Sequence, residues 1–155
     1  MALAYLLTSR LALLGLILVT LGWFDSALAL QTPVRSKLDH RIQHIEYNSE
    51  NVTRLNAANG FITTVIFAPG EKVVNYGSGY STAWEFATAD NQFFLKPKDK
   101  DGTTNLIVVT NKRIYSFDVY LVEKPTNATY KLTFSYPEEN KAIDETKLEQ
   151  GLLDP

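Results

Sequence analysis

The chain of 155 residues contains no cysteine, one methionine and two histidines, His40 and His44. Without cysteine it can form neither disulfide bonds nor the thiolate ligands that structural zinc sites commonly use. It also lacks an excess of charge of one sign, because its formal net charge is −2. Nucleic-acid-binding domains usually carry a basic face, so we expect no direct contact with nucleic acid. Hydrophobic residues are plentiful at 45% of the total, which is enough to build the core of one domain.

The two histidines are the strongest candidates for a metal site. On a helix, side chains four residues apart lie on one face and can share a metal ion. Residues 41–47 instead favour a strand, in which His40 and His44 would lie on one face but about 13 Å apart. A metal site would then need carboxylates from distant parts of the chain. We therefore predict neither a bound metal ion nor another cofactor.

Two glycine-containing segments resemble known functional motifs but lack the required spacing. Gly77-Ser78-Gly79 does not place its serine between glycines two positions away on each side, as a nucleophile elbow requires. Asp99-Lys100-Asp101-Gly102 begins like a calcium loop, but the third acidic position and the later glutamate are missing. We interpret the first as a loop and the second as a turn. A secreted hydrolase is an alternative for which the chain shows no catalytic grouping, so we expect no enzyme.

The first 29 residues have the organisation of a secretory signal peptide. Arg10 precedes an apolar run from Leu11 to Leu21, and Ala27-Leu28-Ala29 supplies small residues for a cleavage site. The alternative is an uncleaved membrane anchor, since Met1–Leu7 is apolar as well. The interruption by Arg10 and the small-residue site favour cleavage after Ala29. No cysteine follows the run, which excludes lipid attachment there. We therefore expect residues 1–29 to be removed during export.

The rest of the chain has the alternation that is typical of short β-strands. In residues 114–121, for example, Tyr115, Phe117 and Val119 share one face and polar residues share the other. The strands predicted in this way are residues 41–47, 61–67, 72–76, 84–87, 92–96, 105–110, 114–121 and 130–136. We predict an all-β domain over residues 39–136. It should be an antiparallel β-sandwich or a barrel-like module of about eight or nine short strands.

Turn residues predict how two pairs of these strands connect. Pro69-Gly70 fits the centre of a type II turn, which would fold residues 72–76 back antiparallel onto residues 61–67. Asn111-Lys112-Arg113 predicts a hairpin between the strands at 105–110 and 114–121. Outside the domain, we predict a flexible N-terminal segment over residues 30–38. Residues 137–155 are charged and predict a linker or tail.

Three aromatic residues form the candidate protein interface. Tyr76, Tyr80 and Trp84 flank the loop at residues 77–79. Exposed aromatic side chains often mark a contact surface, where they contribute much of the binding energy. The alternative is that Trp84 belongs to the core and that both tyrosines are half-buried. We predict no catalytic residue in the chain.

The order and spacing of several short segments are more informative than any one of them. These segments are Asp39-His40-Arg41-Ile42, Glu46-Tyr47-Asn48, Thr64–Lys72, Trp84, Phe94–Pro97, Thr103–Thr110, Tyr115–Asp118 and Tyr130–Pro137. Together they resemble the TrbG/CagX family of conjugal-transfer and type IV secretion proteins.

The resemblance implies a periplasmic structural subunit of an envelope-spanning core complex that supports translocation of DNA or protein. Members of the family assemble as a homo-oligomeric ring with a bitopic inner-membrane protein and a small lipoprotein, and the resemblance implies that this β-domain lies in the inner layer of the ring. Their second β-domain, which meets the outer-membrane lipoprotein, does not follow in this chain, so contact with the lipoprotein is unsupported. The alternative is a stand-alone periplasmic binding or decoy module that caps or regulates the channel.

Overall fold

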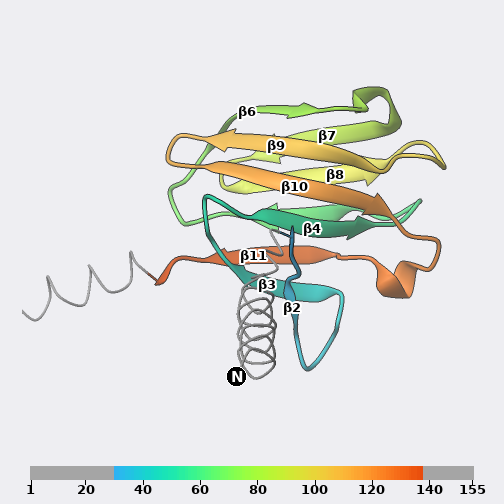
Figure 1. Cartoon of the computed structure of the whole chain (residues 1–155), viewed down its shortest axis with the longest axis horizontal. Coiled ribbons are helices and arrows are strands. Elements are labelled where there is room, and N and C mark those ends of the chain that lie inside the picture. The colour runs from blue at the N-terminus through green and yellow to red at the C-terminus, as the bar shows by residue number, and fades with distance from the viewer. Residues whose placement is uncertain (1–29, 138–155) are drawn as a thin grey trace, which may run out of the picture.

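Two β-sheets pack face to face in the structure, a computed structural model that describes residues 30–137 (Figure 1). The first sheet contains, in order of neighbours, β1 (Leu30–Gln31), β4 (Val52–Ala57), β10 (Ile114–Leu121), β9 (Thr104–Thr110) and β6 (Val73–Ser78). The second contains β2 (Val34–Arg35), β3 (Ile42–Glu46), β11 (Lys131–Ser135), β5 (Thr63–Ile66), β8 (Gln92–Pro97) and β7 (Trp84–Ala89). Two short 3-10 helices, η1 (Ser81–Ala83) and η2 (Pro125–Asn127), lie between strands.

The predicted signal peptide, residues 1–29, and the predicted tail beyond Pro137 lie outside the described residues, so both stay predictions. Among residues 30–137, no helix has the length and apolar character needed to cross a membrane.

The core lies between the sheets and is built by the alternation of inward and outward residues. On β10, Tyr115, Phe117 and Val119 are buried, and on β11 the same holds for Leu132 and Phe134. These are the faces that the sequence pattern predicted, because large inward residues alternate with polar residues such as Ser116 and Asp118 on β10 and Thr133 on β11.

β4 lies inside the first sheet, yet the sequence pattern missed it. Thr53, Leu55 and Ala57 are buried, while the residues between them, including Arg54 and Asn56, are half-exposed. Threonine and alanine on the buried face give little contrast in hydrophobicity with the outer face. Buried and half-exposed residues therefore alternate along β4, but the residue types differ too little in hydrophobicity to reveal this alternation in the sequence.

The predicted all-β sandwich is confirmed, and its two sheets stay open instead of closing into a barrel. The predicted hairpin between β9 and β10 is confirmed as well. The sheets are mixed, however, and not purely antiparallel. β10 lies parallel to β4, and β11 lies parallel to both β3 and β5. Each parallel pair joins segments far apart in the chain, which local turn residues cannot predict.

The predicted hairpin between residues 61–67 and 72–76 is wrong, although its turn forms. Gly70 has a φ of 75°, and the Glu71 N–H donates to the Ala68 carbonyl oxygen at 3.1 Å. The turn carries the chain from β5 in the second sheet to β6 in the first, where β6 pairs with β9. The physical reason is that β8 and β11 occupy both sides of β5, so β6 cannot pair there.

Residues 30–38, predicted to be flexible, contain two short strands. β1 pairs in parallel with β4, and β2 pairs antiparallel with β3. A two-residue edge strand needs no hydrophobic alternation, so the polar composition of the segment concealed it. The segment covers one side of the sandwich, and β6 and β7 form the sheet edges on the other side (Figure 1).

Candidate functional site

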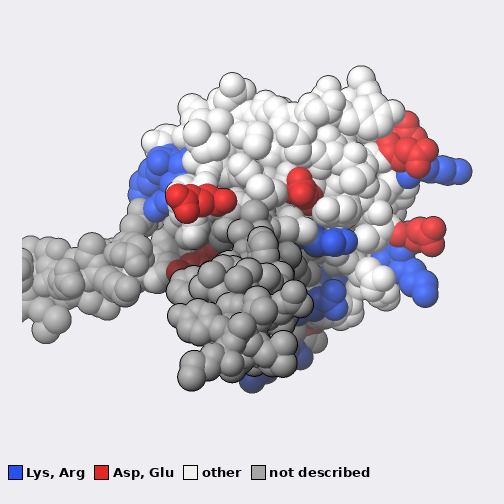
Figure 2. Space-filling model, viewed as in Figure 1, with Lys and Arg blue, Asp and Glu red and all other residues white. Residues whose placement is uncertain are grey.

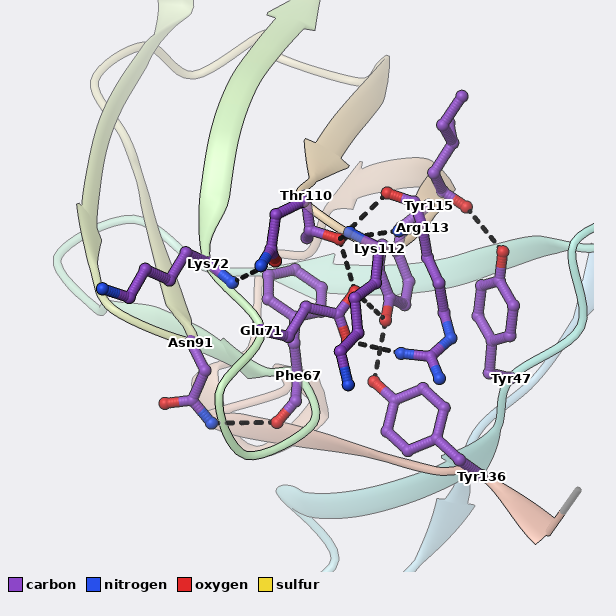
Figure 3. Close-up of polar contacts among 12 residues, drawn as sticks. Tyr47, Phe67, Glu71, Lys72, Asn91, Thr110, Lys112, Arg113, Tyr115 and Tyr136 are labelled. Carbon is purple, nitrogen blue, oxygen red and sulfur yellow. Dashed lines mark hydrogen bonds and ion pairs between the residues drawn. The ribbon is translucent and has the colours of Figure 1, made fainter. Parts of the chain in front are cut away.

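A charged network is buried at one end of the sandwich, where the β5–β6 turn, the β9–β10 hairpin and the end of β11 meet (Figure 3). The Glu71 side chain is 0% exposed, and carboxylates are almost never fully buried unless they are paired. Its Oε1 accepts hydrogen bonds from the hydroxyls of Thr110 and Tyr115, the second at 3.0 Å. Its Oε2 accepts a hydrogen bond from Nη1 of Arg113 at 2.6 Å. The carboxylate is thus balanced by a guanidinium and bonded at both oxygens.

Tyrosine side chains enclose the Arg113 guanidinium. Its Cζ lies 4.1 Å from the ring centroid of Tyr136 and 5.5 Å from that of Tyr47, within the range of cation–π attraction. The hydroxyls of Tyr115 and Tyr136 share a hydrogen bond at 2.8 Å. Burial raises the pKa of Tyr115 well above its usual range and the pKa of Tyr136 to about 12. Both hydroxyls therefore stay protonated at neutral pH and act as hydrogen-bond donors.

This network has the properties of a structural clamp. A general base or nucleophile must reach a substrate, whereas Glu71 is fully buried and its oxygens are bonded within the protein. The network joins Glu71 in a turn, Arg113 in a hairpin and Tyr136 at the end of β11. It therefore fixes the position of Tyr136, where the chain leaves the sandwich.

Two pockets open beside the network at this end of the sandwich. One has a volume of about 440 Å³ and is lined by residues that include Tyr47, Arg113 and Tyr136. The other, of about 510 Å³, shares Tyr47 and Arg113 and extends to Ile114. Glu46 is the only carboxylate residue in either lining, and neither lining contains histidine. Neither lining thus brings together two carboxylates, or a carboxylate and a histidine.

The two histidines, the candidates for metal binding, lie in different surroundings. The ring of His40 contacts the Thr126 carbonyl oxygen, and His44 is exposed on β3. Within residues 30–137, no three histidine, aspartate or glutamate side chains are grouped as ligands for a metal ion.

The predicted interface residues separate into one core residue and two surface residues. Trp84 is 3% exposed, and its Nε1–H donates to the Gly102 carbonyl oxygen at 2.8 Å. The structure thus corrects the prediction for Trp84, because its indole is enclosed by the core and the 98–102 loop. Tyr76 is 42% exposed and Tyr80 is 43% exposed. Tyr76 also packs edge-on against Phe86, at 5.5 Å between ring centroids.

The strand that carries Tyr76 and its neighbour in the first sheet are free of charge. β6 and β9 contain no charged residue, and Figure 2 shows no lysine, arginine, aspartate or glutamate over that part of the visible face. Apolar or uncharged patches of this kind are found at contacts between proteins. Contact of Tyr76 and Tyr80 with a partner stays a prediction.

The sandwich and its clamp lie within a segment that known proteins share. Residues 40–152 match the CagX family of conjugal transfer proteins. The chain belongs to this family. The CagX match begins just before β3 and runs past β11, so it includes every strand except β1 and β2, together with the buried network. It confirms the resemblance that the ordered segments indicated.

Individual relatives of this CagX-family chain are named as secretion proteins. The type IV secretion system protein virB9 of Brucella melitensis biotype 1 is 34% identical over 146 residues, which cover 83% of this chain and 50% of the relative. The type IV secretion system protein PtlF of Bordetella pertussis is 29% identical over 134 residues, or 72% and 49% of the two chains. The virB9 of Bartonella henselae is 36% identical over 116 residues, or 69% and 40%. The chain spans about half the length of the curated relatives it matches.

Sequence reasoning included Glu71 in the segments that carry the CagX resemblance but gave it no role. A glutamate directly after a Pro-Gly turn is expected at the surface, where most turns lie. Its partner Arg113 is 42 positions away in the chain. Nothing in the spacing predicts this contact, because it depends on which strands become neighbours.

Proposed function

We propose that this chain is a non-catalytic structural subunit of the core complex of a bacterial type IV secretion or conjugal-transfer system. The observation that carries the proposal is the CagX-family match over residues 40–152, since it includes the whole sandwich from β3 onward. The names of virB9 and PtlF, both type IV secretion system proteins, support it. A sandwich whose end is fixed by a buried ion pair also suits a building block that holds neighbouring subunits in position.

The proposal includes a location and a set of partners. The predicted signal peptide supports a periplasmic location, with the protein associated with the cell-envelope complex. We propose that copies form a homo-oligomeric ring, joined to a bitopic inner-membrane channel subunit. The ring supports translocation of DNA or protein. The net charge of −2 gives no support for direct contact between this subunit and nucleic acid.

Tyr76 and Tyr80 are the proposed contact residues of this subunit. Both side chains are about half-exposed. Tyr76 lies on β6, which contains no charged residue, and Tyr80 lies beside Lys100 and Asp101. Tyrosine contributes large contact area with little loss of side-chain freedom, so it is common in the energetically important part of an interface.

Size and composition of the native assembly test the proposed function. The full chain, tagged and expressed in its own host, is extracted from the envelope with mild detergent and separated by size. We expect elution as part of a large assembly that contains other channel subunits. Elution as a small species without channel subunits, in cells that make the whole apparatus, would contradict the proposal.

A deletion strain provides the functional measurement. Loss of the chain should abolish transfer, and the unmodified chain should restore it. A variant with both Tyr76→Ala and Tyr80→Ala should fold but assemble poorly, whereas Lys98→Ala, on an exposed loop, is the matched control. Normal assembly of the double variant would remove these two residues from the interface.

A further inference from the structure

A polar pocket lies where the chain crosses from one sheet to the other. β1 belongs to the first sheet and β2 to the second, and the short connection between them bridges the two sheets (Figure 1). The pocket has a volume of about 240 Å³ and is lined by Thr32, Pro33, Arg35, Gln43, Arg54 and Asn56. This lining contains two arginines and two carboxamides, and none of its six residues is a carboxylate. The pocket is therefore positively charged and rich in hydrogen-bond donors.

Gln43 is the buried polar residue of this lining, at 5% exposure. Its Oε1 accepts a hydrogen bond from the Thr129 hydroxyl at 3.1 Å, which fixes the orientation of the carboxamide. Its Nε2 donates to the His40 carbonyl oxygen at 3.4 Å, a long contact that uses one of its two protons. Within the part of the chain that the structure describes, no residue accepts the second proton. A buried donor favours an acceptor, which a group bound in the pocket would supply.

Arg54 is held at the pocket by contacts within the first sheet. Its Nε donates to Oδ1 of Asn56 at 3.2 Å, and its Cζ lies 4.0 Å from the ring centroid of Tyr120. Asp118 lies opposite Arg54 in the pairing of β10 with β4, but the two side chains form no ion pair. The Nη1 and Nη2 groups of Arg54 thus keep their donors for a ligand. Because the guanidinium is already positioned, binding a ligand orders little additional structure.

Arg35 faces the same pocket from the second sheet. It lies opposite Gln43 in the antiparallel pairing of β2 with β3, and residues opposite each other place their side chains on one face of a sheet. Gln43 faces inward, so Arg35 is directed toward the seam between the sheets. Among residues 30–137, Arg35 forms no ion pair. Guanidinium groups from two sheets thus line one pocket, and an anion between them would offset their mutual repulsion.

We propose that this pocket binds a carboxylate, carried by an aspartate or glutamate side chain of another subunit of the core complex. The charge and the donors of the lining select an anion, and a planar carboxylate accepts paired hydrogen bonds from a guanidinium. The volume suits one side chain, since pockets for small-molecule ligands usually exceed about 300 Å³. The source of the carboxylate rests on the proposed function, which supplies the neighbouring subunits. Carboxylate binding itself rests only on the geometry of the pocket.

Titration of the free full chain with sodium acetate tests the pocket without any partner. Sodium chloride keeps the ionic strength constant, and nuclear magnetic resonance follows the side-chain amide of Gln43. Its signal should shift to saturation, because Nε2 gains an acceptor. Arg35→Gln or Arg54→Gln should raise the half-saturating acetate concentration about tenfold, since each removes a charge-assisted hydrogen bond.

Lys37→Gln is the matched control for this titration. It removes the same charge from an exposed position of the same segment, outside the pocket lining. The half-saturating acetate concentration should stay within about twofold of that of the unmodified chain. Absence of a saturable shift at Gln43, or equal weakening by Lys37→Gln, would overturn carboxylate binding. The titration of the unmodified chain decides if an arginine variant does not fold.

Carbodiimide coupling in the purified core complex identifies the source of the carboxylate. Arg35→Lys keeps the positive charge and supplies an amine, which carbodiimide joins to a carboxylate in contact with it. This variant should give a product of higher mass, in which an amide bond joins position 35 to an aspartate or glutamate of another subunit. Arg54→Lys, on the other wall, should couple to the same carboxylate. Arg35→Gln, which has no amine at this position, should give no such bond.

Carboxylate binding and the proposed function can fail separately. If the chain is in the complex and positions 35 and 54 couple only within the chain, or not at all, the partner's carboxylate is overturned and the proposed function stands. If the chain is absent from the complex, the proposed function and the partner's carboxylate are both overturned. The acetate titration then still decides whether the pocket binds a carboxylate.

Discussion

Replacing Arg113 by methionine tests the buried network most directly. Arg113→Met keeps much of the aliphatic stem but leaves the Glu71 carboxylate with its two hydroxyl donors and without the guanidinium that balances its charge. Removing one partner of a buried ion pair costs about 3–5 kcal/mol. The Arg113 side chain is 13% exposed while that of Glu71 is 0% exposed, so the group left behind is the more deeply buried one. We expect the free energy of unfolding to fall by about 3 kcal/mol or more.

The combination of Arg113→Met with Glu71→Leu separates loss of the charge balance from loss of packing. The hydroxyls that bonded to Glu71 keep other partners in this double variant. The Thr110 hydroxyl donates to the carbonyl oxygen of residue 113 at 3.0 Å, and the hydroxyls of Tyr115 and Tyr136 lie 2.8 Å apart. An apolar pair in place of a buried ion pair is often neutral or stabilising, so the double variant should regain at least about 2 kcal/mol over Arg113→Met.

Urea denaturation followed by circular dichroism measures both free energies. Lys96→Ala is the control, because Lys96 forms an exposed ion pair with Glu85 at 3.7 Å and should contribute less than about 1 kcal/mol. The reasoning is refuted if the free energy of unfolding of Arg113→Met lies within about 1 kcal/mol of that of the unmodified protein. It is also refuted if the double variant is no more stable than Arg113→Met.

Three further predictions concern a turn, a tyrosine and a tryptophan. Gly70→Ala, at a φ of 75°, should cost about 1–2 kcal/mol in urea denaturation, whereas Gly77→Ala in β6 meets open space and should cost much less. The pKa of Tyr136 is raised to about 12 in the folded state, so the native protein holds a proton that the unfolded chain releases near its ordinary value of 10.0. Stability should therefore fall as pH rises through this window, and Tyr136→Phe should reduce the fall in a series of thermal melts. Trp84→Ala should cost about 3–5 kcal/mol through loss of core packing, while Tyr80→Ala should change thermal stability by no more than about 0.5 kcal/mol.

Sequence patterns predicted the strands whose two faces differ strongly in hydrophobicity. β10 and β11 belong to this group, because large apolar residues alternate with polar ones along each strand. β4 does not, since Thr53 and Ala57 on its buried face differ little from its outer residues. The pairing of strands was predictable only where a short turn joins them, as between β9 and β10. The parallel neighbours of β11 come from distant parts of the chain.

The candidate surfaces were predictable only in part. Sequence reasoning grouped Tyr76, Tyr80 and Trp84 as a candidate interface, with a core position for Trp84 as the alternative, and the structure places Trp84 in the core. The indole of Trp84 is enclosed because the loop carrying Gly102 folds over it, with a carbonyl oxygen placed to accept from Nε1. The contact of Glu71 with Arg113 follows from the order of strands in space.

The parallel pairing of β3 with β11 limits when the domain can fold. Ile42 lies opposite Lys131, roughly 90 positions later in the chain, and such distant contacts slow folding. Without β11 the second sheet consists of two separate pieces, β2 with β3 and β5 with β8 and β7. A chain that is still being synthesised thus cannot complete the sheet. The second sheet stays in two pieces until its last strand has been made.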